Sequence, residues 1–197
     1  MENGKLREQI LNHKILSKKS GVIVELDKSY STEQYLDYIA KELSDGVGII
    51  ELSANGVGDK IFLETAQKTK QLCEMFGGTL IIKERADIAY LSSADSVNLN
   101  KESVDTDSVR KILEENSLIG REISINSDES DLVKLDADYI TTTIYPASTQ
   151  PVLETGIEYA KWVSEKTLLP VLIREIRYET ENNFGTQYNL FVKLADK

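Results

Sequence analysis

Short apolar runs alternate along the chain with longer stretches in which apolar residues recur every three or four positions. The runs are rich in Val and Ile and several alternate with period two, which is typical of β-strands. They lie at 21–26, 47–52, 79–84, 95–100, 121–126, 138–143, 170–175 and 188–194. The stretches between them predict helices at 31–46, 60–78, 86–94, 105–117, 128–135 and 153–167. In the first of these, Tyr35, Ile39 and Leu43 share one face, and Ser31 or Thr32 is the expected N-cap.

This alternation predicts an α/β fold in which helical crossovers join parallel strands. Eight strands joined by helices suggest a TIM-type (β/α)8 barrel. The barrel would be small, because such a barrel typically takes ~250 residues and this chain has 197. Its C-terminal unit is expected to be incomplete, since no helical pattern follows Leu194. The alternative fold is an open doubly wound sheet of six or seven strands.

We expect an N-terminal helical extension at 1–20 and the barrel at 21–197. Leu6, Ile10 and Leu11 recur at helical spacing in the extension. It is expected to cap the bottom of the barrel or dock on its side, and a partner-binding helix is the alternative.

Composition narrows the function classes. A net charge of −10 and a pI near 4.7 disfavour a nucleic-acid binder and docking on anionic membranes. No apolar run approaches the ~18 residues of a membrane span, and charges throughout the first 20 residues disfavour a secretory signal. The lone Cys73 and His13 exclude an internal disulfide, a cysteine-rich zinc site and chemistry that needs two imidazoles. A cytoplasmic setting is therefore expected.

In either fold the chemistry should lie at the carboxyl ends of the strands, and the side chains there should converge around one opening. These ends are polar and carry both signs of charge; they read Glu25-Leu26-Asp27, Glu51-Leu52-Ser53-Ala54-Asn55, Lys83-Glu84-Arg85, Asn98-Leu99-Asn100-Lys101-Glu102, Ser124-Ile125-Asn126, Thr141-Thr142-Thr143 and Arg174-Glu175-Ile176-Arg177.

Several blocks at these ends occur in the order of one known family. They are Glu51–Gly56 (ELSANG), Ile81–Ala89 (IIKERADIA), Ala94–Ser103 (ADSVNLNKES) and Asp136–Gln150 (DADYITTTIYPASTQ). Over about residues 20–175 the chain resembles thiamine phosphate synthase and its thiazole tautomerase relatives. The resemblance implies a barrel that couples hydroxymethylpyrimidine diphosphate with thiazole phosphate, releases pyrophosphate and uses Mg²⁺.

The resemblance also implies site residues. Ser124 and Glu84 match catalytic positions, and Glu84 and Glu102 are the candidate Mg²⁺ ligands. The substrate-binding candidates are Glu51, Ser53, Asn55, Lys83, Asn98, Thr149 and Gln150. The ordinary alternatives are a rim carboxylate paired with Lys83 or Lys101 for Glu84, a salt bridge inside the barrel for Glu51, and common strand-end or loop residues for Ser124 and Thr149.

The departures from the family pattern concern charge. Ser53, Asn55 and Gln150 replace an Arg and two Lys of the diphosphate site, and Ser103 replaces a Mg²⁺-ligand Asp. Arg174-Glu175 replaces the Gly-Gly turn that holds the thiazole phosphate. Lys83, Lys101 and Arg121 are the nearby replacement cations.

We therefore expect weak Mg²⁺ binding and reduced or lost coupling activity, because a departing pyrophosphate needs cations. The alternatives are a non-catalytic barrel that binds a small phosphorylated ligand or a partner protein, and a different enzyme that uses Glu84, Glu51 or Lys83 as acid or base. The sequence leaves the oligomeric state open.

Overall fold

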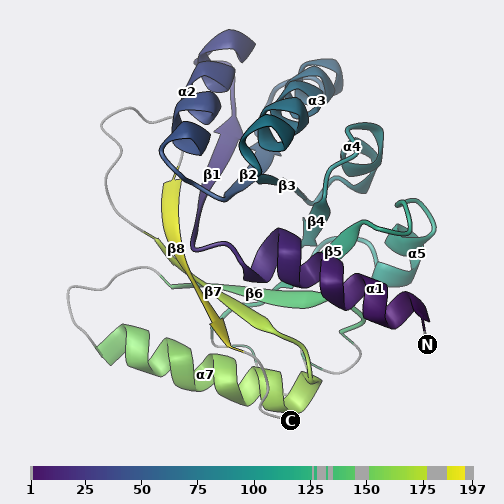
Figure 1. Ribbon diagram of the computed structural model, residues 1–197, viewed down its shortest axis with the longest axis vertical. Helices are drawn as coiled ribbons and strands as arrows, with labels where there is room; N and C mark the ends of the chain where they lie inside the picture. The colour runs from purple at the N-terminus through teal and green to yellow at the C-terminus, as the bar shows by residue number, and fades with distance from the viewer. Residues whose placement is uncertain are drawn as a thin grey trace.

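A closed barrel forms the centre of the computed structural model (Figure 1). The structure describes residues 2–125, 127, 132, 135–144, 151–176 and 186–193. Strands β1 to β7 pair in parallel in chain order, and β8 pairs antiparallel with both β7 and β1. The small TIM-type barrel is thus confirmed, and the open doubly wound sheet is wrong because β8 joins the two edges.

The strands are β1 (Ser20–Leu26), β2 (Ile49–Ala54), β3 (Thr79–Lys83), β4 (Ser96–Leu99), β5 (Leu118–Glu122), β6 (Tyr139–Ile144), β7 (Val171–Ile176) and β8 (Thr186–Lys193). The helices are α1 (Glu2–Leu11), α2 (Thr32–Ser44), α3 (Asp59–Phe76), α4 (Ala86–Leu91), α5 (Thr106–Arg110) and α7 (Pro151–Thr167), and a π-helical turn, η1 (Asn12–Leu16), follows α1. The predicted helix at 128–135 falls largely outside the described residues.

Three sequence-based expectations need correction. The fifth strand is Leu118–Glu122 and not 121–126, so Glu122 ends it and Ser124 follows it. The helix expected at 105–117 is only the short α5. The last strand runs antiparallel, whereas a (β/α)8 unit would make it parallel. The first error arose because apolar residues alternate at Ile123 and Ile125, a pattern typical of a strand. In the structure, however, the segment that pairs in the barrel is Leu118–Glu122, directly before them.

Helices α2, α3 and α4 cover the outer face of the first strands. Tyr35, Ile39 and Leu43 of α2 pack in one core cluster with Val24 of β1 and Ile50 of β2. The start and end of these helices follow local signals. Ser31 and Gln34 form a capping box at α2, and Gly77 ends α3 in the left-handed conformation that glycine adopts at low cost. Cys73 is buried in the same cluster.

The N-terminal segment closes the amino-terminal end of the barrel. Leu11 and Ile15 are buried against the inward-facing Ile49, Ile81 and Leu172. Around this contact, the carbonyl of Lys14 accepts a hydrogen bond from Thr79 Oγ1, and Lys18 Nζ donates to the carbonyl of Gly77. The segment therefore forms a plug that leaves the opposite end, where strands β1 to β7 finish, as the mouth.

Two aspartates tie the strands together at the plugged end. Asp95 precedes β4, and its Oδ2 accepts a hydrogen bond from the backbone N–H of Leu80 in β3 at 2.9 Å. Asp138 precedes β6, and its Oδ2 accepts one from the backbone N–H of Ile119 in β5 at 2.7 Å. The same device thus repeats two strands apart, in the Ala94-Asp95 and Ala137-Asp138 pairs of the matched blocks.

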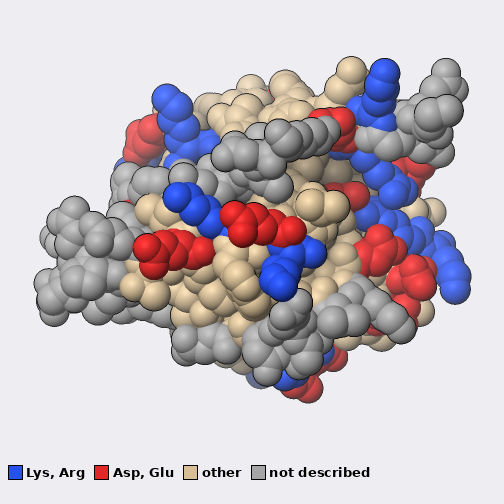
Figure 2. Space-filling model, turned by 90° about the horizontal axis from the view of Figure 1, so that it is seen from below, with Lys and Arg blue, Asp and Glu red and all other residues tan. Residues whose placement is uncertain are grey.

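The surface carries both signs of charge. Figure 2 shows Lys and Arg side by side with Asp and Glu on the face seen from below. Within the described part of the chain, no helix is both long and apolar enough to cross a membrane.

Candidate functional site

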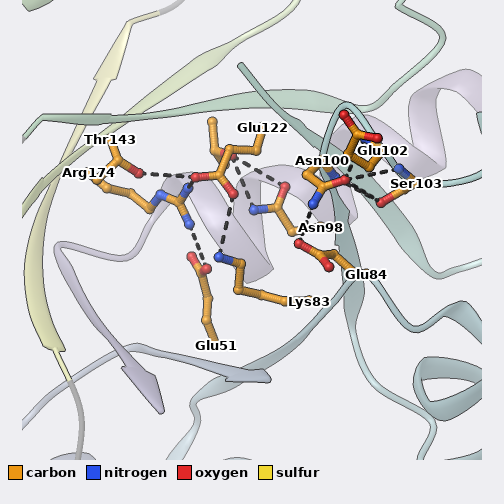
Figure 3. Close-up of polar contacts among 11 residues, drawn as sticks. Glu51, Lys83, Glu84, Asn98, Asn100, Glu102, Ser103, Glu122, Thr143 and Arg174 are labelled. Carbon is orange, nitrogen blue, oxygen red and sulfur yellow. Dashed lines mark hydrogen bonds and ion pairs between the residues drawn. The ribbon is translucent and has the colours of Figure 1, made fainter. Parts of the chain in front are cut away.

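A buried guanidinium lies at the centre of the barrel. Arg174 of β7 is 1% exposed and donates from Nη1 to Glu51 Oε2 of β2 at 2.6 Å. Its Nη2 donates to Glu122 Oε1 of β5 at 2.5 Å (Figure 3). Neither β2 nor β5 is a neighbour of β7 in the sheet, so both contacts cross the interior. The ordinary alternative for Glu51, a salt bridge inside the barrel, is therefore what the structure contains.

Two further donors reach the Glu122 carboxylate. Lys83 Nζ of β3 lies 3.6 Å from Glu122 Oε2, and Thr143 Oγ1 of β6 donates to Oε1 at 3.3 Å. Burial raises the pKa of Glu122, but the positive charges of Arg174 and Lys83 outweigh it, so the pKa lies below its usual range. Glu122 is therefore held as a carboxylate with partners on three strands.

Neutral polar pairs occupy other positions in the barrel interior. Asn98 of β4 and Thr141 of β6 exchange hydrogen bonds at 3.2 and 3.3 Å. Ser96 Oγ and the Tyr139 hydroxyl are 2.8 Å apart. A Cβ added at Gly120 would meet the Tyr139 ring at 2.5 Å, so glycine makes room for the ring there. On β2, β3 and β7, the apolar inward residues Ile49, Ile81 and Leu172 near the plug are thus followed toward the mouth by charged ones.

The rim beside β3 and β4 is organised by an amide. Asn100 Nδ2 donates to Glu84 Oε1, while Asn100 Oδ1 accepts from the backbone N–H groups of Glu102 and Ser103 and from Ser103 Oγ (Figure 3). The backbone at Glu84 is left-handed, with φ 66°. Glu84 thus contacts an amide and not the Lys83 or Lys101 expected for a rim ion pair.

Arg121 stabilises the loop after β4. Its Nη1 donates to the carbonyl of Asn100 at 2.8 Å, and its other nitrogens reach the carbonyl of Val104 and Thr106 Oγ1. Of the three replacement cations, Arg121 is therefore committed to loop structure, Lys101 is exposed, and Lys83 is the one that extends into the barrel.

The structure brings most of the predicted site residues to the mouth. Glu51, Lys83, Glu84, Asn98 and Glu102 lie in one region in Figure 3. Ser53 lies opposite Glu25 in the β1–β2 pairing, and Asn55 Nδ2 donates to Glu25 Oε1 at 3.2 Å.

Ser124 lies beyond the end of β5 and is exposed, and its backbone carbonyl accepts a hydrogen bond from the Tyr159 hydroxyl. Thr149 and Gln150 lie outside the described residues. The catalytic, substrate-binding and metal-binding roles of all these residues stay predictions.

The described residues do not fit the magnesium site that the resemblance implies. No group of three or more His, Cys, Asp or Glu side chains suited to a metal occurs among them. Ser103 stands at the ligand position and donates its hydroxyl to Asn100 Oδ1, which also accepts two backbone N–H groups. Mg²⁺ prefers several hard, charged oxygens, so Glu84 and Glu102 alone make a poor donor set.

Sequence reasoning missed Glu122 as a site residue and took Arg174 only as the loss of a glycine. The misplaced fifth strand hid Glu122, because it put Ser124 at the strand end. The available signal was the charge balance of inward positions, in which Arg174 and Lys83 require carboxylates across the barrel.

Comparison with known proteins agrees with the barrel and its strand-end blocks. The family model described as thiamine monophosphate synthase matches residues 22–173. The chain belongs to this family. It is 29% identical over 147 residues to the thiamine-phosphate synthase of Caldivirga maquilingensis, covering 74% of this chain and 71% of that protein. It is 31% identical over 171 residues to the thiamine-phosphate synthase of Prochlorococcus marinus, covering 84% of this chain but only 48% of that protein.

Solved structures of other proteins share the barrel architecture of this member of the thiamine monophosphate synthase family. Thiamine phosphate pyrophosphorylase from Pyrococcus furiosus superposes with a TM-score of 0.59 at 21% identity, covering 77% of this chain and 72% of that one. The 3-dehydroquinate dehydratase of Geobacillus kaustophilus gives the same TM-score of 0.59 at 10% identity. Two proteins with different names match equally well, so this likeness shows the fold alone.

Proposed function

We propose that this protein keeps the thiamine phosphate synthase scaffold but makes thiamine phosphate far more slowly than an ordinary family member, or not at all. One observation carries the proposal. The Arg174 side chain, at a position where the resemblance expects glycine, fills the centre of the barrel between Glu51 and Glu122. What remains is a barrel that binds a ligand without coupling two substrates.

The ion pairs argue against a substrate in the same space. A substrate phosphate placed beside Arg174 would also meet the carboxylates of Glu51 and Glu122, which repel it. Moving either carboxylate away takes one of two carboxylate partners from a buried guanidinium, and removing one partner of a buried pair costs about 3–5 kcal/mol. The two departures from the family pattern therefore stabilise one another. Glu51 stands where the resemblance expects a neutral side chain, and Arg174 stands where it expects glycine.

Apart from the Arg174 cluster, the expected diphosphate site lacks positive charge. Ser53 and Asn55 stand where the resemblance expects Arg and Lys, and Asn55 is bonded to Glu25. A charge-assisted hydrogen bond contributes roughly 1.5–3 kcal/mol. Losing several of them at a leaving group costs orders of magnitude in rate, because each ~1.4 kcal/mol is tenfold.

The experiment is a coupling assay on the purified chain with both thiamine precursors and Mg²⁺. We expect little or no thiamine phosphate. Restoring the cations alone (Ser53→Arg, Asn55→Lys, Gln150→Lys) should improve diphosphate binding, measured by calorimetry, more than turnover. Adding Arg174→Gly and Glu51→Gln to that variant should then raise turnover, because the interior is opened.

The matched control for the opened variant is Arg174→Met with Glu51→Leu in the same cation-restored background. It removes the ion pair but keeps the interior filled, so turnover should stay low. Turnover by the unmodified chain at the rate of an ordinary family member, or robust complementation of a thiamine-requiring strain, would overturn the proposal.

A further inference from the structure

The Glu122 carboxylate occupies a set of donors that resembles a ligand site. Arg174 Nη2, Lys83 Nζ and Thr143 Oγ1 come from β7, β3 and β6 and converge on its two oxygens (Figure 3). Three donors from three separate strands around one carboxylate are the arrangement expected of an anion site. Here the anion is part of the chain.

The two carboxylates of Arg174 are not equivalent. The Glu51 side chain is 2% exposed, whereas that of Glu122 is 26% exposed and that of Lys83 is 22% exposed. Glu122 and Lys83 therefore face the mouth, and Glu51 holds the guanidinium from the closed side. A molecule entering through the mouth would reach Glu122 first and could replace it without disturbing Glu51.

Charge selects the class of anion. Without Glu122, Arg174 and Lys83 carry two positive charges and Glu51 carries one negative charge, so the site has one positive charge left. A monocarboxylate neutralises it, and its two oxygens reproduce those of Glu122. A phosphate dianion would exceed it and would bring a second negative charge close to Glu51.

We propose that Arg174, Lys83 and Thr143 form a binding site for a small monocarboxylate, and that Glu122 fills this site as an internal ligand until such an anion enters from the mouth. The inference concerns the same cluster as the proposed function but makes a separate claim. The coupling assay tests turnover, whereas this site is tested by anion binding alone.

The experiment removes the internal ligand and supplies a free one. Glu122→Ala should have a lower melting temperature than the parent chain, because a buried guanidinium loses one partner. Formate should raise that melting temperature in a saturable way, as a ligand bound only to the folded state does. Chloride and phosphate at equal ionic strength should raise it much less. In the parent chain, formate must first displace Glu122, so it should raise the melting temperature only at a higher concentration than in Glu122→Ala.

Direct binding is measured by the line width of ¹³C-formate on titration with protein. Glu122→Ala should bind it, and adding Lys83→Met should weaken the affinity by about tenfold or more, because one charge-assisted contact is lost. Glu122→Gln should bind it more weakly than Glu122→Ala, since the amide still fills the space. If Glu122→Ala does not fold in chloride, the yield of refolding in formate against chloride is the readout.

The matched control is Glu84→Ala, which removes a mouth carboxylate that accepts a hydrogen bond from the Asn100 amide and lies outside the Glu122 cluster. Formate should stabilise it no more than it stabilises the parent chain. Equal stabilisation of Glu122→Ala by formate and chloride, equal effects of formate on Glu84→Ala and Glu122→Ala, or tighter binding of phosphate than of formate would each overturn the proposal.

Discussion

The Asp95 carboxylate contacts three donors at the plugged end of the barrel. Lys14 Nζ and Lys70 Nζ each lie 2.9 Å from its Oδ1, and the Leu80 amide binds its Oδ2. Lys14 belongs to η1, Lys70 to α3 and Leu80 to β3, so one carboxylate joins the plug, a covering helix and the sheet. Asp95 therefore stabilises the plugged end, whereas barrel chemistry lies at the other end.

The first stability prediction concerns the Asp95→Asn variant. The amide keeps the shape but loses the charge that faces two ammonium groups, so the free energy of unfolding should fall by about 2–4 kcal/mol. Chemical denaturation at neutral pH measures it. Glu74→Ala is the control, because Glu74 also pairs with Lys70 but is 63% exposed, and it should change stability by less than ~0.5 kcal/mol.

The Asp95 effect should depend on pH. Burial raises the pKa of Asp95, but Lys14, Lys70 and the Leu80 amide lower it more, so its folded-state pKa lies below the ordinary value. The stabilisation is therefore present above the unfolded pKa of ~3.9 and is lost as the pH falls through the folded pKa. A difference between Asp95→Asn and the parent chain that stays constant down to strongly acid pH would contradict this assignment.

Single residues were only partly predictable from the sequence. Asp95 and Asp138 lie in blocks that carry the family resemblance, but the sequence indicated no structural role for them, and their bonds to neighbouring strands became visible only in the structure. The central cluster was only half predictable. A salt bridge inside the barrel was one of the two interpretations of Glu51, but its partner Arg174, which lies 123 residues away, was not foreseen. Such a pairing depends on closure of the barrel, which local pattern does not encode.

At the scale of elements, the strand-helix alternation predicted each strand and helix of the first half of the barrel with ends that differ from the observed ones by at most three residues. Capping residues explain this success, because Ser31 and Gly77 act locally. The errors arose where pairing overrides local pattern, as in β5. The plug shows the same limit. Its helix was predicted from Leu6, Ile10 and Leu11, but Leu6 is 45% exposed, and the deepest contact is made by Ile15 in a π-helical turn.

The plug yields the second stability prediction. Ile15 is fully buried among side chains of several strands, so Ile15→Ala should reduce the free energy of unfolding by about 2–5 kcal/mol. Leu6→Ala is the matched control on the same segment and should cost far less because its side chain is half exposed. Urea denaturation of the two variants gives the comparison. Equal losses would mean that the segment does not seal the barrel through Ile15.

For the whole molecule, closure depends on one antiparallel strand. Gly21 pairs with Tyr188 on one side of β8, and Leu172 pairs with Val192 on the other. Without β8, the edges of β1 and β7 would expose unpaired backbone groups, which promote association between chains. A chain that ends at residue 176 should therefore form larger species than the full chain, as measured by light scattering after size-exclusion chromatography.

The full chain under the same conditions is the reference, and a peptide of residues 186–193 added in excess should reduce the association by occupying the open edges. A truncated chain with the same size distribution as the full chain, and with unchanged stability, would show that β8 is dispensable for closure.

The direction of β8 also decides which end of the barrel stays accessible. Because β8 runs against the other strands, its last residue, Lys193, pairs with Val171, the first residue of β7, at the end that the N-terminal segment plugs. The described chain therefore enters and leaves the barrel at the same end. If the protein were fused or immobilised through the N-terminal or the C-terminal side of the described chain, the mouth, with Lys83 and Glu122, would face away from the attachment. In a sensor built on this scaffold, attachment and ligand entry would occur at opposite ends.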